Sequence, residues 1–250
     1  MDIIDLSALF EKKLLVTTKQ QKIESIQAIC KGRYYRKHNL PNSIKYIQKI
    51  LMVNNYQCST NNDDGRTNSC IDESNVINIL KNDKLLKNRL YIPPIRHWFD
   101  IAVKDFQYGR LPINIKSTTT LTADNTGNIA MCVYALTSTE LDMKKSYNNG
   151  KMSKVLIQCL KNNEKNYNKK KDYYFVVINK NKHEVIINSL KGISNLTSNI
   201  NNLPFQIKWN KNKHYYYKPI DECISLIINT IKKPKPSWRE TFLNEIRNLN

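Results

Sequence analysis

The stretch HWFDIAVKDFQYGRLPINIKS, residues 97–117, decides the fold. Its first third, 97–103, is short, apolar and rich in residues that favour strands. Its last third, 111–117, alternates apolar and polar residues as a strand does. Between them, residues 104–110 have the composition of a turn. The stretch therefore predicts a β-hairpin.

The second strand of this hairpin has an apolar face and a polar face. Side chains alternate along a strand, so Ile113 and Ile115 would point one way, and Asn114 and Lys116 the other. Asp100 lies on the first strand of the same hairpin. We therefore expect an acid, an amide and a lysine to face one cleft.

Residues of these types suit the hydrolysis of a phosphodiester bond. That reaction needs a nucleophilic water, relief of negative charge in the transition state and help for the leaving oxygen. A divalent metal held by carboxylates, such as Mg²⁺, supplies much of this. A lysine beside the metal can orient or deprotonate the water and neutralise developing charge. The alternatives are that Asp100 ends a strand in solvent and that Lys116 is an ordinary surface lysine.

The patterns around the hairpin indicate an α/β protein. Residues 1–90 read as a helical N-terminal region, with a polar loop at 54–70 and a helix at 73–89. Residues 91–250 would hold the catalytic core, in one compact unit with that region. The further predicted elements are helices at 128–137, within the lysine-rich 142–172, at 219–233 and after Ser237, and strands at 172–180, 183–190 and 203–209.

The charge of the chain indicates a polyanionic partner. The 250 residues include 40 lysines and arginines against 21 acids, which gives a net charge of +19. Codon bias in an AT-rich genome can inflate lysine, but it does not explain the shortage of acids. We expect nucleic acid as the partner, because no strongly basic amphipathic helix points to a membrane surface.

Several protein classes do not fit the sequence. No apolar run approaches the roughly 18–20 residues that a membrane span needs, and the first residues lack the features of a secretory signal. We therefore expect a cytoplasmic protein. The six cysteines are scattered without a C-x-x-C pair, so free thiols are expected and a structural zinc site is not.

Basic clusters are candidates for contact with DNA phosphates, some of them mixed with aromatic residues. A run of lysines is also often no more than a solvated face. The candidates are Arg33, Arg36, Lys144, Lys145, Lys169, Lys170, Lys171, Lys208 and Lys211.

The sequence W-F-D-I-A-V followed by L-P-I-N-I-K-S resembles the PD-(D/E)XK nuclease motif, particularly that of type II restriction endonucleases. The A-D-N at 123–125 and the late strand LPFQIKW at 203–209 are similar to features of some of these enzymes. The resemblance covers roughly residues 91–240, and its specific part lies in 98–137. It implies a restriction-endonuclease-like core, a central mixed β-sheet flanked by helices, with Mg²⁺ as the cofactor.

Asn114 departs from the family pattern, because it stands where a carboxylate is expected. An uncharged amide binds a metal less well, although its carbonyl oxygen can still be a ligand. Another acid could compensate. Asp124 is the nearest candidate, although Asp124-Asn125 could instead cap the following helix. Glu24 is a weaker candidate, since helices packed beside this hairpin often add an acid in such nucleases.

The leading hypothesis is a type II restriction endonuclease that cuts double-stranded DNA at a specific sequence. By analogy, it would act as a homodimer on a palindromic site and be partnered by a cognate DNA methyltransferase. One alternative is a repair or junction nuclease of the same fold. Another is a non-catalytic DNA-binding protein, which would not need Asp100 and Lys116 together on one hairpin.

Overall fold

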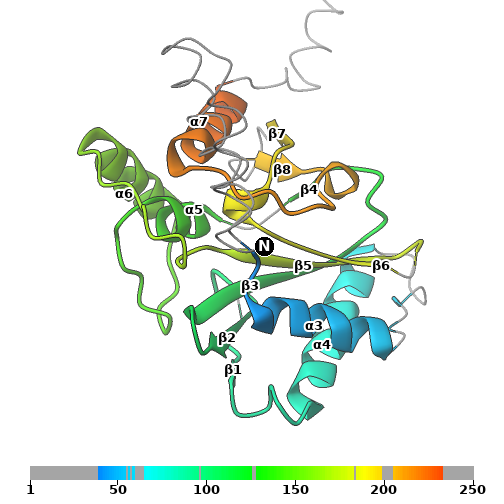
Figure 1. Ribbon diagram of the computed structural model, residues 1–250. Coiled ribbons are helices and arrows are strands. Elements are labelled where there is room, and N and C mark those ends of the chain that lie inside the picture. The colour runs from blue at the N-terminus through cyan, green and yellow to red at the C-terminus, as the bar shows by residue number, and fades with distance from the viewer. Residues whose placement is uncertain are drawn as a thin grey trace, which may run out of the picture. The chain divides into compact units, whose positions relative to one another are not determined.

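The computed structural model describes residues 39–54, 56, 58, 59, 65–95, 97–125, 128–182, 184–198 and 205–232 (Figure 1). The described residues from Leu40 onward belong to one compact unit. No helix in this part of the chain is both long and apolar enough to cross a membrane.

A five-stranded mixed sheet forms the centre of the fold, in the order β1-β2-β3-β5-β6. β2 and β3 are antiparallel, β3 and β5 are parallel, and β5 and β6 are antiparallel. Helices flank the sheet, so the prediction of an α/β protein with a central mixed sheet is confirmed. The strands are β1 (Leu90–Tyr91), β2 (Ile101–Asp105), β3 (Gly109–Thr118), β5 (Tyr174–Asn179) and β6 (Glu184–Ser189).

The predicted hairpin is confirmed as β2 and β3, but its predicted bounds were wrong. β2 begins at Ile101, so Asp100 precedes the strand instead of lying on it, and the turn is shorter than the predicted 104–110. Ile101 pairs with Ile113 and Asp105 pairs with Gly109, without a break in register. The Asp105 carboxylate closes the turn, because it accepts hydrogen bonds from the backbone N–H groups of Gln107 at 2.8 Å and Tyr108 at 3.1 Å. Gly109 has a φ of +74°, a conformation that few other residues adopt readily.

Helices α3 (Asn42–Val53) and α4 (Gly65–Asn82) cover one face of the sheet (Figure 1). Their buried apolar residues pack in one cluster with Ile113 and Ile115 of β3. The predicted boundaries of α4 were wrong, since residues 65–70 are helical rather than loop and the helix ends at Asn82 rather than 89. The polar first half of α4 lacks an apolar stripe, and Asp72 fixes it by hydrogen bonds instead.

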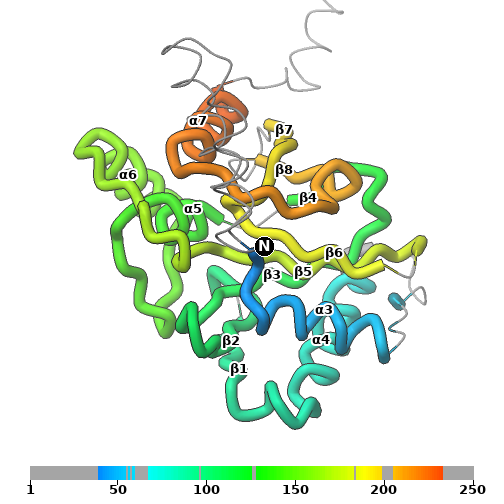
Figure 2. The backbone as a smooth tube through the Cα atoms, in the orientation of Figure 1, coloured from blue at the N-terminus to red at the C-terminus, as the bar shows by residue number. Residues whose placement is uncertain are grey.

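The other face of the sheet is covered by α5 (Ile129–Leu136), α6 (Asn149–Lys161) and α7 (Ile220–Ile231). Figure 2 traces the chain through α5 and α6 between β3 and β5. This long connection lets two parallel strands lie side by side. All three helices lie where the sequence predicts them.

A small second sheet has the order β4-β8-β7. Its strands are β4 (Asp124–Asn125), β7 (Leu196–Ser198) and β8 (Phe205–Ile207). β8 confirms the centre of the strand predicted at 203–209, whereas β4 and β7 were not predicted. The predicted helix after Ser237 lies outside the described residues. The five described cysteines are free thiols, as expected.

Candidate active site

Asp100 directly precedes β2, and Lys116 lies on β3 beyond Ile113, the last residue that pairs with β2. The N–H of Asp100 donates to the carbonyl of Ile113 at 3.0 Å, and its Oδ2 accepts from the N–H of Ile115 at 2.6 Å. The carboxylate therefore reaches across to β3. Burial raises the pKa of Asp100, and the positive charge of Lys116 and the Ile115 N–H offset part of that rise. Both side chains are half-buried.

Beyond Ile113, β3 has no strand partner on the β2 side within the described residues. Residues 114–118 continue to pair with β5 on the other side only. This uncovered side of β3 leaves room for a side chain from another element. It is the helix α4 that supplies one.

Glu73 of α4 joins this group, although its own stretch of sequence gives no sign of a functional role. The pKa of Glu73 is raised to about 7, first by burial and then by the negative charge of Asp100, while Lys116 lowers it. Glu73, Asp100 and Lys116 therefore share one electrostatic environment. Two carboxylates this close repel each other when both are ionised.

Asp72, the neighbour of Glu73, fixes α4 on β3. Its buried carboxylate accepts hydrogen bonds from the hydroxyls of Ser117 and of Tyr56, the latter at 2.9 Å, and lies 3.4 Å from Lys180 Nζ. Burial raises the pKa of Asp72, but these partners and the Ser59 N–H lower it below its usual value. Since Ser117 follows Lys116, this contact sets the position of Glu73 relative to the lysine.

Asn114 is buried on β3 two residues before Lys116, with 6% of its surface exposed. Its side chain is hydrogen-bonded to Tyr173, whose hydroxyl donates to the carbonyl of Trp98 at 2.9 Å. The Oδ1 atom of Asn114 has no hydrogen-bond partner among the described residues. A buried acceptor without a partner is costly, so it indicates a place for a bound cation or water.

Asp124, the nearest candidate for a compensating acid, also lies close enough to Lys116 to feel its charge. Burial raises its pKa, whereas a hydrogen bond with Thr118 and the charge of Lys116 lower it. The alternative that Asp124-Asn125 caps the next helix is wrong. Both residues form β4, and Asn128 caps α5 by accepting a hydrogen bond from the N–H of Met131.

The donor chemistry of the site fits a hard divalent cation, which prefers oxygen ligands. The available oxygens are the carboxylates of Glu73 and Asp100 and the unpaired Oδ1 of Asn114. Within the described part of the chain, no three His, Cys, Asp or Glu side chains are gathered so that they could hold a metal ion. Asp124 is therefore not joined with Glu73 and Asp100 in one ligand set.

The sequence could have found Glu73 only through the expectation of an acid on a helix beside the hairpin. That expectation selected Glu24, which lies outside the described residues. Nothing in the local pattern of α4 says that it packs on β3. The contact depends on the Asp72–Ser117 hydrogen bond, which joins residues 45 positions apart.

The predicted DNA-contacting residues lie in different environments. Arg33 and Arg36 are outside the described residues. Lys171 is buried, and its ammonium donates to the carbonyl of Thr139 at 2.7 Å and to Glu140 at 2.9 Å. It is therefore not an ordinary surface lysine. The others are exposed or half-buried: Lys144, Lys145, Lys169, Lys170, Lys208 and Lys211.

A scan against protein-family models finds no match to this chain, and a search of curated proteins finds none either.

Proposed function

We propose that this chain is a Mg²⁺-dependent endonuclease of the type II restriction kind, which hydrolyses phosphodiester bonds in double-stranded DNA. The observation that carries the proposal is the electrostatic interaction of three half-buried side chains, those of Glu73, Asp100 and Lys116. Two carboxylates with a lysine are the groups that this hydrolysis requires.

Each residue has a distinct part in the proposed reaction. Glu73, Asp100 and the Oδ1 of Asn114 would hold the metal ion. When bound, Mg²⁺ supplies a Lewis acid and a more acidic water. The ammonium of Lys116 positions the attacking water and stabilises negative charge on the phosphate. The Ile115 N–H keeps the Asp100 carboxylate turned toward β3.

Glu73 resolves the difficulty that Asn114 raises. An amide contributes no charge to a metal site. With Asp100 and Asn114 only, the site would carry one negative charge. With Glu73, the site has two carboxylates. The acid comes from a helix beside the hairpin, as the resemblance implies, although from α4 rather than from the helix that holds Glu24.

Two further observations support DNA as the substrate. The net charge of +19 favours a polyanion. The mixed five-stranded sheet flanked by helices agrees with the core that the resemblance implies. For a palindromic target, a homodimer gives each strand its own active site, and a cognate methyltransferase would protect the host DNA.

The direct test is to incubate the protein with unmethylated plasmid and phage DNA, with Mg²⁺ or with EDTA. Discrete fragments that appear only with Mg²⁺ are expected, and sequencing their ends would give the recognition site. The Lys116→Ala variant should bind DNA without cutting it. Lys104→Ala is the matched control, because Lys104 is an exposed lysine on the same hairpin.

Other outcomes of this experiment separate the alternatives. Cleavage restricted to branched or damaged DNA would indicate a repair or junction nuclease. Binding without cleavage of any DNA would indicate a non-catalytic DNA-binding protein and would end the proposal.

A further inference from the structure

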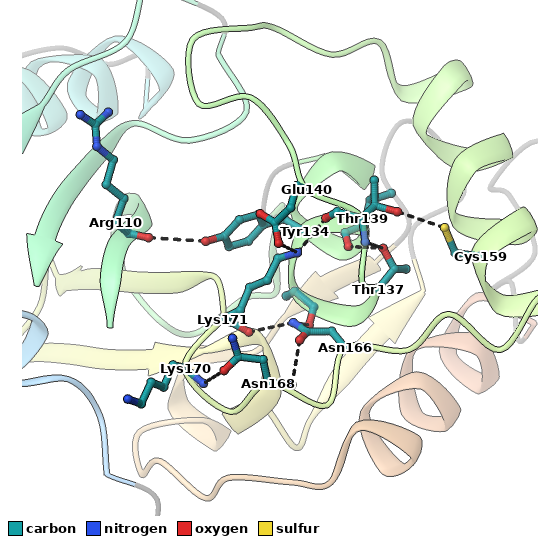
Figure 3. A network of polar contacts seen from close by, with 12 residues as sticks. Arg110, Tyr134, Thr137, Thr139, Glu140, Cys159, Asn166, Asn168, Lys170 and Lys171 are labelled. Atoms are coloured by element: carbon teal, nitrogen blue, oxygen red, sulfur yellow. Dashed lines mark hydrogen bonds and ion pairs between the residues drawn. The ribbon is translucent and has the colours of Figure 1, made fainter. Parts of the chain in front are cut away.

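A polar cavity of about 300 Å³ lies at the opposite end of β3 from the candidate active site. Tyr108 and Arg110 line it from the hairpin, and Tyr134 lines it from α5. Glu140, Lys170 and Lys171 complete its polar wall. Figure 3 shows Tyr134, Glu140 and Lys171 close together. The Tyr134 hydroxyl donates to the backbone carbonyl of Arg110 at 3.4 Å, and the Arg110 guanidinium lies over the ring of Tyr91. The cavity thus has three cationic residues and one acid.

Lys171 is an unusual feature of this cavity. Only 9% of its side chain is exposed, and its Nζ lies 5.1 Å from the centre of the Tyr134 ring. Burying an ammonium group is costly unless it is paired. Its ionic partner is Glu140, at 2.9 Å, and 80% of the Glu140 side chain is exposed. The cation is fixed and its anion is free to move into solvent.

The surroundings hold Lys171 in place. Its backbone carbonyl accepts a hydrogen bond from Asn166 Nδ2 at 3.0 Å and another from the buried Lys191 Nζ at 2.9 Å. Its own ammonium also donates to the carbonyl of Thr139 at 2.7 Å. The position of this positive charge is therefore built into the fold, whereas its ion pair with Glu140 is easily exchanged.

We propose that this cavity binds a phosphate group of a nucleotide, and that the Glu140 carboxylate occupies the phosphate position until the nucleotide arrives. Arg110 and Lys170 would add two exposed cations at the rim, and Tyr108 and Tyr134 would offer ring surface to a sugar or base. The inference rests on the proposed function only in taking DNA as the first source of phosphate; a free nucleotide carries the same chemistry.

The cavity and the candidate active site lie at the two ends of one strand. Arg110 and Lys116 are six positions apart on an unbroken strand, so they project to the same face. At about 3.3 Å per residue they are separated by roughly 20 Å along the strand. That distance corresponds to about six base pairs of DNA. The cavity would hold phosphate some distance from the bond that is cut.

The test is a DNA-binding titration in EDTA, so that cleavage plays no part. The Glu140→Gln variant should bind a short duplex about two- to fivefold more tightly, because it removes the competing anion of an exposed ion pair. Asp221→Asn is the matched control, since Asp221 also pairs with a lysine, Lys165 at 2.7 Å, outside the cavity. It should leave the affinity unchanged.

The double variant Arg110→Ala/Lys170→Ala should weaken binding and reduce the slope of log K against log salt by about 1.8, the value for two lost phosphate contacts. The double variant Lys45→Ala/Lys49→Ala, on the other face of the sheet, is the matched control. It should change neither the affinity for DNA nor the salt slope. Competition with dAMP separates the two sources. If dAMP binds and these variants alter only its affinity, the phosphate comes from a free nucleotide.

The inference is overturned if Glu140→Gln binds DNA and dAMP no better than Asp221→Asn, with circular dichroism showing both variants folded. This result is independent of the proposed nuclease activity. A protein that never cuts DNA can still show the tighter binding, and an active nuclease can fail to show it.

Discussion

Replacing Glu73 by glutamine should stabilise the metal-free protein while abolishing cleavage. In the folded protein the pKa of Glu73 is about 7, against an ordinary value of 4.5, because burial and Asp100 disfavour the carboxylate. An acid with a raised pKa costs no stability below pH 4.5, where it is protonated in both states. The cost grows as the pH rises and is complete above pH 7.

The size of this effect follows from the two pKa values. One pKa unit is about 1.36 kcal/mol, so the difference between 4.5 and about 7 sets a ceiling of about 3.4 kcal/mol at pH 8. Glu73 is only half-buried, and solvent screening reduces this to about 1–2 kcal/mol. For a chain of this size that corresponds to a rise in Tm of about 2–8 °C for Glu73→Gln.

Thermal unfolding in EDTA at pH 5 and pH 8 measures this prediction. At pH 8 the Tm of Glu73→Gln should be higher than that of the unchanged protein. At pH 5 the difference between the two Tm values should be smaller. Asp221→Asn, at an exposed pair on α7, controls for the loss of one charge. If Glu73→Gln is equally stable or less stable than the unchanged protein at pH 8, Glu73 is not the strained carboxylate that we describe.

Three further predictions concern the same site. Lys116→Ala should lower the cleavage rate at least about 100-fold, measured on a plasmid that carries the recognition site, whereas Lys104→Ala should retain full activity. Asn114→Asp should lower the Mg²⁺ concentration for half-maximal cleavage by about tenfold, because it adds a charged ligand; an unchanged requirement would remove Asn114 from the metal site. Asp72→Asn should lower the free energy of unfolding by about 3 kcal/mol in urea titrations, because it breaks a buried pair with Lys180 and loses hydrogen-bond acceptance. A stable Asp72→Asn protein would show that α4 is held in another way.

The sequence predicted those parts of the site that depend on local order. Asp100 directly precedes β2 and Lys116 lies on β3, so the local order of one hairpin was enough to bring them together. The hairpin, α5 and the β5–β6 pair were also predicted from local sequence. α5 and β5 are short apolar runs that the fold buries almost completely, and short turns join the paired strands.

What the sequence did not predict depends on contacts between distant segments. Glu73 lies on a helix whose first half has no apolar stripe, and the contact that fixes it, Asp72 with Ser117, spans 45 positions. The burial of Lys171 could not be predicted either, because it also depends on contacts between distant segments. In a lysine-rich run, nothing local distinguishes the one lysine whose ammonium finds a carbonyl and a carboxylate inside the fold.

The contacts of Asp72 with Ser117 and Lys180 also determine when the candidate active site can assemble during synthesis of the chain. The segment with Glu73 leaves the ribosome first, but it has no fixed place until β3 is available. β3 in turn pairs with β5, and Lys180 follows β5, more than a hundred residues after Asp72. Contacts between such distant residues form late in folding. A nascent or half-folded chain would therefore carry every residue of the site without its arrangement, and the proposed cleavage activity would arise only with the finished fold.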